Sequence, residues 1–228
     1  MQNQQSFSPT FLNGKVILIT GGSRGGMLLE IAREYLNHGA EAVILFARNQ
    51  QKLIEVTSSL GPKAHYEQGD VSKIDSVKAA VARIVAKFGK IDILVNGAAG
   101  NFLATAEKLS TNGFRRVLEI DTLGTFHMSQ QVFVQSMKAR KEGIIINIGA
   151  NLHWNGSWAQ VHSAGAKAAN DSMTKVLAVE WGPVGIRVNE LVPGAIEGTE
   201  GFERLGALDN LNSKEKSNSA MSKKTTSG

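Results

Sequence analysis

The chain contains 228 residues, of which 42% are hydrophobic, which is enough to bury one substantial core and favours a single domain. It has no cysteine, so disulfides and thiolate metal sites are excluded, and its longest apolar runs are too short to span a bilayer. The formal net charge is +5, but no stripe of lysine and arginine interleaved with aromatic residues accompanies it, which argues against nucleic-acid binding.

Strand-like and helix-like patterns alternate along the chain. Short apolar or β-branched runs predict strands at residues 15–19, 42–46, 91–95, 143–148 and 186–191. Apolar residues at helical spacing predict helices at residues 27–38, 72–88 and 164–180, with a further long helix within residues 114–139. Near-continuous apolar strands with helices between them are typical of a parallel sheet covered on both faces. We therefore predict an α/β fold with a Rossmann-like, doubly wound parallel sheet in three αβα layers.

The two ends of the chain are polar. Residues 1–10 have neither the apolar segment of a signal peptide nor the arginines of a mitochondrial presequence. Residues 207–228 are rich in Ser, Lys, Asn and Thr, so we expect a flexible polar tail after a single domain at residues 1–206. The last three residues are not a peroxisomal address of the Ser-Lys-Leu type.

A glycine cluster lies between the first predicted strand and the first predicted helix. Glycine lets the backbone approach a pyrophosphate closely, and a helix N-terminus offers free N–H groups and a favourable dipole. The alternative is an ordinary glycine-rich turn, and the position between a strand and an amphipathic helix argues against it. The predicted cofactor-binding residues of this loop are Gly21, Ser23, Arg24, Gly25 and Gly26.

An arginine, Arg48, follows the second predicted strand. An acidic residue near this position would bind the ribose of NAD, whereas an arginine suits the 2′-phosphate of NADP. Arg24 in the glycine loop is a second candidate for the same phosphate. Either arginine alone could equally be an ordinary surface residue, but the two together favour NADP(H) over NAD(H).

Over residues 11–206 the chain resembles the short-chain dehydrogenase/reductase family. After the glycine loop, the motifs of that family recur in order as Gly69-Asp70-Val71, Asn96-Gly97-Ala98-Ala99-Gly100, Lys167 in a long helix, and Pro193-Gly194. The resemblance implies that Asp70 and Val71 border the adenine. It also implies that the Asn96–Gly100 segment, with Asn96 and Ala98, supports the sheet and lines the cofactor. It implies that the nicotinamide is enclosed by Pro193, Gly194, Ile196 and Thr199. One departure is Met27, where the family has a third glycine, and we expect it to weaken cofactor binding without abolishing it.

The catalytic tetrad of the family is changed at three of its four positions. Counting from Lys167, the tyrosine position holds Ser163, the serine position holds Ala150 and the asparagine position holds Asp121. A serine hydroxyl is shorter than a phenol and a much poorer acid, so Ser163 cannot replace the tyrosine that protonates a carbonyl oxygen. This argues against a carbonyl reductase. Either the chain is inactive, or its reaction needs no acid at a carbonyl oxygen.

The second explanation agrees with a closer resemblance to one branch of the family, the peroxisomal-type 2,4-dienoyl-CoA reductases. The similar segments are residues 97–103, 121–126, 161–162, 166–169, 178–183 and 198–201. In that branch hydride reaches the far carbon of a conjugated diene and negative charge spreads to the thioester oxygen, so the site must align the hydride donor and stabilise a delocalised anion. The resemblance implies NADPH-dependent reduction of 2,4-dienoyl-CoA to 3-enoyl-CoA in the β-oxidation of unsaturated fatty acids. It further implies a homotetramer and a peroxisomal location, the cytoplasm being the alternative.

The resemblance also implies roles for individual side chains. Lys167 would bind the nicotinamide ribose and support the dienolate, Asp121 would orient Lys167 or a catalytic water, and Asp171 would share the proton relay. The acyl-CoA substrate would contact Phe102, Ser110, Asn112 and Arg204. Each side chain has a structural alternative, which is a surface or capping position for the polar residues and core packing for Phe102.

Members of the family continue beyond the position of Gly206 with a substrate loop, a helix and a seventh strand, which the polar tail replaces. We therefore expect a chain that is C-terminally truncated relative to the family, with an exposed sheet edge, lower stability and impaired tetramer assembly. This expectation motivates two alternative functions: a catalytically weak NADP(H)-binding protein of the same fold, and an enoyl-thioester reductase. His127 and His153 offer no metal-ligand spacing, so we expect no metal.

Overall fold

The computed structural model of the chain describes residues 8–194 and residue 196. A compact unit ends at Gly194, and six of its strands form one sheet in the order β3-β2-β1-β4-β5-β6. Every pairing between neighbouring strands of this sheet is parallel. The strands are β1 (Val16–Thr20), β2 (Ala42–Ala47), β3 (Ala64–Gln68), β4 (Ile93–Asn96), β5 (Gly143–Ile148) and β6 (Ile186–Leu191).

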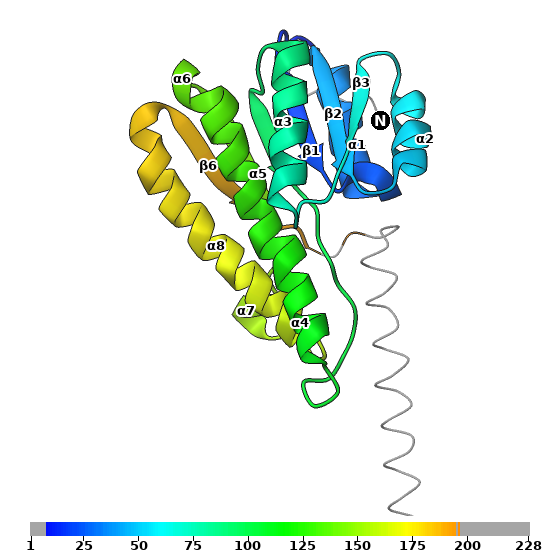
Figure 1. The fold of residues 1–228 in the computed structure, drawn as a ribbon, viewed down its shortest axis with the longest axis vertical. Coiled ribbons are helices and arrows are strands. Elements are labelled where there is room, and N and C mark those ends of the chain that lie inside the picture. The colour runs from blue at the N-terminus through cyan, green and yellow to red at the C-terminus, as the bar shows by residue number, and fades with distance from the viewer. Residues whose placement is uncertain (1–7, 195, 197–228) are drawn as a thin grey trace, which may run out of the picture. The chain divides into compact units, whose positions relative to one another are not determined.

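Helices connect the strands and cover the sheet (Figure 1). The α-helices are α1 (Met27–Asn37), α2 (Gln50–Leu60), α3 (Ile74–Phe88), α4 (Thr111–Leu118), α5 (Gly124–Val132), α6 (Lys138–Arg140), α7 (Leu152–Asn155) and α8 (Val161–Trp181). Two π-helical segments join α4, α5 and α6 into the predicted long helix; they are η2 (Glu119–Leu123) and η3 (Phe133–Met137). The two 3-10 turns are η1 (Gly22–Arg24) and η4 (Gly182–Val184). None of these described helices is long and apolar enough to cross a membrane.

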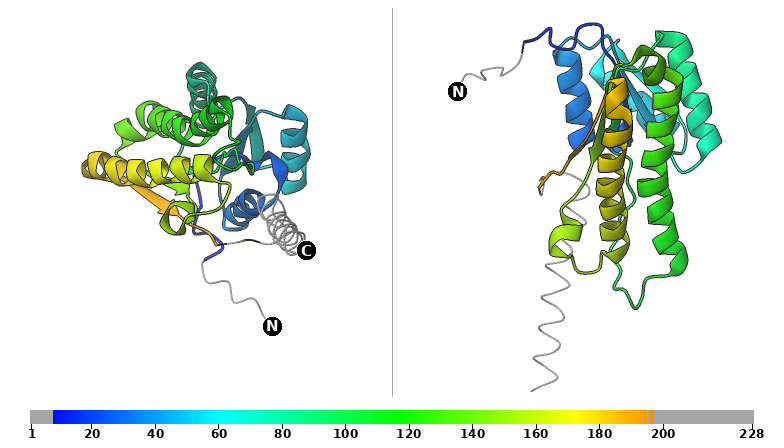
Figure 2. Two further views of the ribbon diagram at one scale, coloured as in Figure 1. Left: turned by 90° about the horizontal axis from the view of Figure 1, so that it is seen from below. Right: turned by 90° about the vertical axis from the view of Figure 1, so that its left-hand side faces the viewer.

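Alternate strand residues point into two apolar cores, one on each face of the sheet. On β1, Val16 and Leu18 join the core that α3, α5 and α8 cover, whereas Ile17 and Ile19 join the core that α1 and α2 cover. Figure 2 shows the sheet between α1 on one side and the helices α3, α5 and α8 on the other. The predicted three-layer αβα fold is therefore confirmed.

The order of the strands reverses beside β1. From β1 the chain passes outward through β2 and β3, and then returns with β4 to the other side of β1. In an open parallel sheet, ligands bind beyond the carboxyl ends of the strands at such a switch point. The last residues of β1 and β4 are paired in register, so Thr20 and Asn96 border the place where a cofactor is expected.

The elements that the apolar patterns do not predict include the edge strand β3 and the helix α2. None of the five residues of β3 is fully buried, and three of them are His65, Glu67 and Gln68, so β3 has no apolar run. Helix α2 buries only Leu53 and Thr57 fully. Because both elements lie at the margin of the sheet, they remain in contact with water and tolerate polar residues that hide a strand or helix from a search for apolar periodicity.

Candidate active site

The glycine loop between β1 and α1 contains three residues whose backbone is in the positive-φ region, Gly21 (92°), Gly25 (75°) and Gly26 (70°). A Cβ atom on Gly21 would lie 2.8 Å from the Cα atom of Ala98, so the backbones of two loops approach each other here without room for a side chain. The N-cap residue of α1 is Gly26, which provides no side-chain hydrogen bond to the first turn. Uncapped amides at the N-terminus of a helix suit a pyrophosphate, so the residues present fit a dinucleotide.

A side chain at Gly21 is expected to be more harmful than one at an equally positive φ without close neighbours. Gly89 is the matched position, because its φ is 77° and an added Cβ would meet nothing within 4 Å. We expect Gly89→Ala to lower the free energy of unfolding by about 1–2 kcal/mol through backbone strain alone. Gly21→Ala adds an overlap that costs about 1–3 kcal/mol more and displaces the loop that is expected to contact the cofactor. Urea unfolding and NADPH titration measure both effects, and equal losses in the two variants would contradict the expectation.

The remaining predicted residues of the loop are Ser23 and Arg24, both in η1; the Arg24 side chain lies outside the described part of the structure. Met27, the departure from the family pattern, is the first residue of α1 and packs partly buried against the core under α1 and α2. The fold therefore accommodates its side chain, and a weaker affinity for the cofactor stays a prediction.

Asn96 and Thr20 brace the carboxyl ends of the central strands. The buried Asn96 amide donates hydrogen bonds of 2.9 Å to the Ser129 hydroxyl and to the Asn147 side-chain oxygen, which ties β4 to α5 and to β5. The Thr20 hydroxyl oxygen accepts hydrogen bonds of 3.1 Å from the backbone amides of residues 97 and 98. These contacts set the position of Ala98 beside Gly21 and give Asn96 the sheet-supporting place that the resemblance implies.

Asp70 follows β3 and is held by Arg116 on α4. No motif in the sequence indicates this arginine. The Asp70 carboxylate accepts hydrogen bonds from the Ser72 amide at 2.9 Å and from the Arg116 guanidinium at 3.2 Å. Burial acts to raise the pKa of Asp70, but the hydrogen bonds from Ser72 and Arg116 outweigh it and hold that pKa below its usual value. Val71 is buried against Gly124 of α5, and Arg48 is exposed just after β2.

Lys167 and Asp121 meet at the centre of the candidate site. The Lys167 Nζ atom donates a hydrogen bond of 2.8 Å to the Ile148 carbonyl oxygen at the end of β5 and lies 3.5 Å from Asp121 Oδ1. Lys167 is 9% exposed and Asp121 is completely buried. The other carboxylate oxygen of Asp121 is buried without a hydrogen-bond partner among the described residues. Lys167 and Asp121 thus lie within reach of each other, as the prediction that Asp121 orients Lys167 requires.

Asp121 occupies the π-helical segment η2, and helical irregularities of this kind are frequent at functional sites. Burial raises the pKa of Asp121, while the nearby charges of Lys167 and His162 act to lower it without cancelling the effect of burial. Ser163 is buried one turn before Lys167 on α8, at the tyrosine position. The centre therefore contains a buried cation and a buried carboxyl group but no phenol.

Asp171 is turned toward a different set of partners. Its carboxylate accepts a hydrogen bond of 2.8 Å from Lys175 and lies 3.7 Å from the His153 ring. The hydrogen bond from Lys175 holds the pKa of Asp171 below its usual value. Among the described residues, its ion pairs are with Lys175 and His153, so a role in a proton relay with Lys167 stays a prediction.

Phe102 lies on the loop after β4 and is 40% exposed. Its ring stacks on the ring of the buried His162 with 4.4 Å between centroids, and the His162 Nε2–H group donates a hydrogen bond of 2.9 Å to the Phe102 carbonyl oxygen. His162 Nδ1 is buried without a partner among the described residues. His162 therefore positions the Phe102 loop at the beginning of α8.

The other predicted substrate and nicotinamide residues lie at the start of α4, after β6 or outside the described residues. Ser110 is the N-cap of α4 and accepts a hydrogen bond of 3.1 Å from the Gly113 amide, and Asn112 accepts one of 3.2 Å from Arg115. Both capping and substrate binding remain compatible with these exposed positions. Pro193 is half-buried after β6, whereas Gly194 and Ile196 are exposed. Thr199 and Arg204 lie outside the described residues.

Metal ligation has no support in the described ranges, 8–194 and 196. No group of three or more histidine, aspartate or glutamate side chains that could hold a metal ion occurs within them. The two histidines lie on different elements. The His127 Nδ1–H group on α5 donates a hydrogen bond of 2.9 Å to the Val71 carbonyl oxygen, whereas His153 belongs to α7.

Comparison with known proteins places this geometry in a family. The peroxisomal 2,4-dienoyl-CoA reductase of Danio rerio is 45% identical over 204 residues, which are 88% of this chain and 67% of that protein. A short chain dehydrogenase from Bacillus anthracis has a similar crystal structure with a TM-score of 0.79 and 42% identity, covering 83% of this chain and 77% of that one. An actinorhodin polyketide ketoreductase variant solved with NADPH has a TM-score of 0.77 and 30% identity, covering 80% and 71%. The sequence pattern of the short chain dehydrogenases matches residues 15–208, and the chain belongs to this family.

Proposed function

We propose that this chain is an NADPH-dependent 2,4-dienoyl-CoA reductase that produces 3-enoyl-CoA. The observation that carries the proposal is the buried contact between Lys167 and Asp121 in a site whose tyrosine and serine positions hold Ser163 and Ala150. A carbonyl reduction needs an acid at the carbonyl oxygen, whereas reduction of a conjugated dienoyl thioester spreads charge over the diene and needs chiefly alignment and a nearby cation. The similarity to reductases of this name supports the same substrate class.

The family binds a nicotinamide cofactor, and when bound NADPH supplies the hydride. In the proposed arrangement the glycine loop and the N-terminus of α1 would hold the pyrophosphate. Arg24 and Arg48 would bind the 2′-phosphate, and Asp70 and Val71 would border the adenine. Asn96 and Ala98 would line the cofactor, and the nicotinamide would be enclosed by Pro193, Gly194, Ile196 and Thr199. Together these residues would exclude water from one face of the reacting carbons and fix their alignment.

The proposed roles at the reacting centre follow from charge and burial. Lys167 would hold the nicotinamide ribose and stabilise the negative charge that develops at the thioester oxygen. Asp121 would fix the direction of the Lys167 ammonium group and accept a hydrogen bond from the water that delivers the proton to carbon. Asp171, one helical turn after Lys167 on α8, would share the proton relay. Phe102 would pack on the acyl chain, and the CoA moiety would contact Ser110, Asn112 and Arg204.

The proposal extends to the setting of the enzyme. Relatives named as peroxisomal enzymes support a location in the peroxisome, and the resemblance to the family supports a homotetramer. We further propose that residues 1–206 are the catalytic domain and that residues 207–228 are a polar tail. Size measurement in solution tests the homotetramer, and imaging of the tagged protein in cells tests the peroxisomal location.

The decisive experiment incubates the purified chain with NADPH and a 2,4-dienoyl-CoA and follows the loss of nicotinamide absorbance. Turnover with the diene supports the proposal. NADPH binding without turnover on any thioester would identify a weak nucleotide-binding protein instead. Turnover with a simple 2-enoyl-CoA but not with the diene would identify an enoyl-thioester reductase. The 3-enoyl and 2-enoyl thioesters are isomers of equal mass, so chromatographic separation against authentic standards identifies which one is formed.

Replacing Arg48 tests the preference for NADPH. The side chain is exposed after β2, where an arginine suits the 2′-phosphate of the cofactor. Hydrogen bonds between charged partners contribute about 1.5–3 kcal/mol, so Arg48→Ala is expected to raise the KM for NADPH about 10–100-fold. The KM for NADH, which lacks the 2′-phosphate, serves as the internal control and should change little. An equal change for both cofactors would argue against a phosphate contact.

A further inference from the structure

Glu190, near the end of β6, faces the helix that carries Lys167. The alternate residues Ile186 and Val188 belong to the core under α8, so Glu190 projects from β6 on the same face. Its Oε1 atom packs directly against the Cα atom of Gly149, where no Cβ would fit, and is buried without a hydrogen-bond partner among the described residues. Gly149 directly follows Ile148, whose carbonyl oxygen accepts the hydrogen bond from Lys167.

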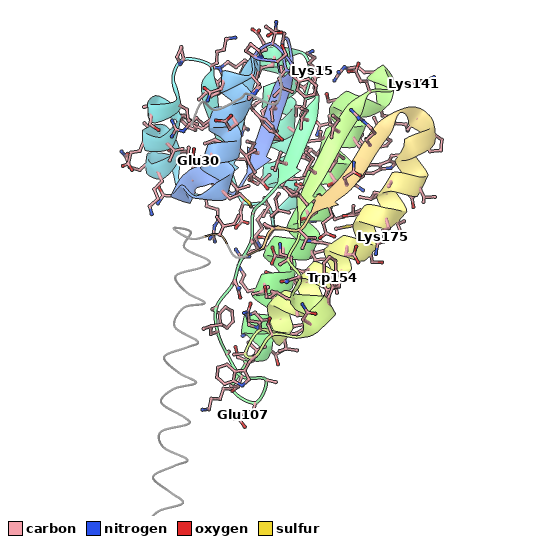
Figure 3. All side chains as sticks on the ribbon, turned by 180° about the vertical axis from the view of Figure 1, so that it is seen from behind. Lys15, Glu30, Glu107, Lys141, Trp154 and Lys175 are labelled. Atoms are coloured by element: carbon pink, nitrogen blue, oxygen red, sulfur yellow. The ribbon has the colours of Figure 1, made fainter. Side chains whose placement is uncertain are left out.

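The Glu190 carboxyl group lies near that of Asp171 on α8, close enough for each carboxyl group to change the pKa of the other. The charged and titratable groups that face this pair are His153 of α7 and Lys175 and Lys167 of α8. Figure 3 shows the helices α7 and α8, with Trp154 labelled on α7 and Lys175 on α8. Two carboxyl groups from different elements, β6 and α8, therefore lie side by side near the candidate catalytic lysine.

Two carboxylates in contact cannot both be ionised, so one of them holds a proton. Asp171 has a cationic partner, Lys175, at 2.8 Å and a histidine at 3.7 Å, which stabilise its ionised form. Glu190 has an oxygen that is buried and unpaired, and this is tolerated far better by a neutral carboxylic acid than by a carboxylate. The proton therefore resides on Glu190, whose O–H group donates to the Asp171 carboxylate.

We propose that Glu190 is a positioning residue whose protonated carboxyl group fastens the end of β6, and with it residues 192–194, to the helix that carries Lys167. The inference rests on the proposed function in so far as residues 192–194 enclose the nicotinamide. Loss of the proton places two negative charges side by side and releases the end of β6 from α8. The chain thus has a contact that closes at low pH and opens at high pH, outside the Lys167–Asp121 pair.

The direction of the pH effect follows from linkage. Burial and the neighbouring Asp171 charge raise the pKa of Glu190 above its ordinary value, and Lys167 and His153 only partly oppose them. A carboxyl group with a raised pKa holds its proton longer in the folded than in the unfolded state. Its contribution to stability is complete below the ordinary glutamate pKa and is lost as the pH rises through the raised pKa.

Glu190→Gln tests the proposal, because glutamine has the shape and the hydrogen-bond donor of the protonated acid but cannot ionise. The ratio of the unfolding equilibrium constants of the wild type and Glu190→Gln is expected to rise with pH, with a limiting slope of about tenfold per pH unit. The same titration of Glu180→Gln, at an exposed position on α8, should give no slope. This readout needs no turnover, so it stands even where the proposed reaction fails.

The kinetic counterpart compares pH profiles of turnover with NADPH and a 2,4-dienoyl-CoA. The wild type should lose activity on the alkaline side as Glu190 ionises, and Glu190→Gln should keep its activity over that range. Glu190→Ala, which removes the donor, should resemble the alkaline wild type at every pH. A flat ratio of unfolding constants together with coincident pH profiles for the wild type and Glu190→Gln would overturn the proposal.

Discussion

Lys167→Ala is expected to lower turnover of a 2,4-dienoyl-CoA by about 10²–10³-fold, the usual loss when one fixed electrostatic donor is removed from a reacting centre. The Lys167 ammonium group is held from two sides, by the Ile148 carbonyl oxygen at 2.8 Å and by Asp121 at 3.5 Å. These two contacts would hold the Lys167 ammonium group where the proposed reaction develops negative charge on the thioester oxygen. The loss should appear in kcat more than in KM, because the charge on the substrate arises only in the transition state.

Two controls separate chemistry from folding in this experiment. Lys138→Ala removes an exposed lysine from α6 and should leave turnover unchanged. In Lys167→Ala the buried Asp121 loses the cation that opposes the effect of burial, so the pKa of Asp121 should rise further and the carboxyl group should become neutral. Circular dichroism and urea unfolding check that the variant is folded at the assay temperature. Undiminished kcat in a folded Lys167→Ala variant would remove Lys167 from the reacting centre.

The fold was predictable wherever burial is nearly complete. All residues of β1 and the first five of β2 are buried, so these strands read as continuous apolar runs. The amphipathic helix α3 likewise turns Val77, Val81 and Ile84 toward the core at helical spacing. The edge strand β3 and the helix α2 lack this pattern, since water contacts much of their surface. Periodicity detects burial rather than secondary structure itself, and it fails where an element is only half-covered.

The candidate site was predictable in part, because the residues that carry the family resemblance also fold together. Lys167 and Asp121 are 46 positions apart and could be paired only through that resemblance, yet the structure places them in contact. The partners of these residues left no comparable signal. Arg116 beside Asp70 and Glu190 beside Asp171 are ordinary charged residues in the sequence, and only the packing of α4 and β6 gives them a specific neighbour.

Asp121 provides a prediction in which stability and activity move differently. Burial raises its pKa, so the folded state binds the proton more tightly than the unfolded state. The stability associated with this proton is fully present below the ordinary aspartate pKa and is lost as the pH rises through the raised value. Asp121→Asn keeps an oxygen that accepts a hydrogen bond from Lys167 but cannot ionise. The wild type should therefore lose stability relative to Asp121→Asn as the pH rises.

Urea unfolding of both proteins from about pH 4 to about pH 8 measures this difference directly, with a limiting slope near tenfold per pH unit in the ratio of unfolding constants. Turnover should be highest in the wild type, although the wild type is the less stable protein at high pH. Asp121→Ala loses both the charge and the acceptor and is expected to lower turnover by about 10²-fold, and Asp121→Asn by less, because it still orients Lys167. If the ratio of unfolding constants were independent of pH, Asp121 would keep the same charge in both states, and the buried contact with Lys167 would have to offset the whole effect of burial. The pair would then act as a fixed salt bridge, and the raised pKa of Asp121 would be refuted.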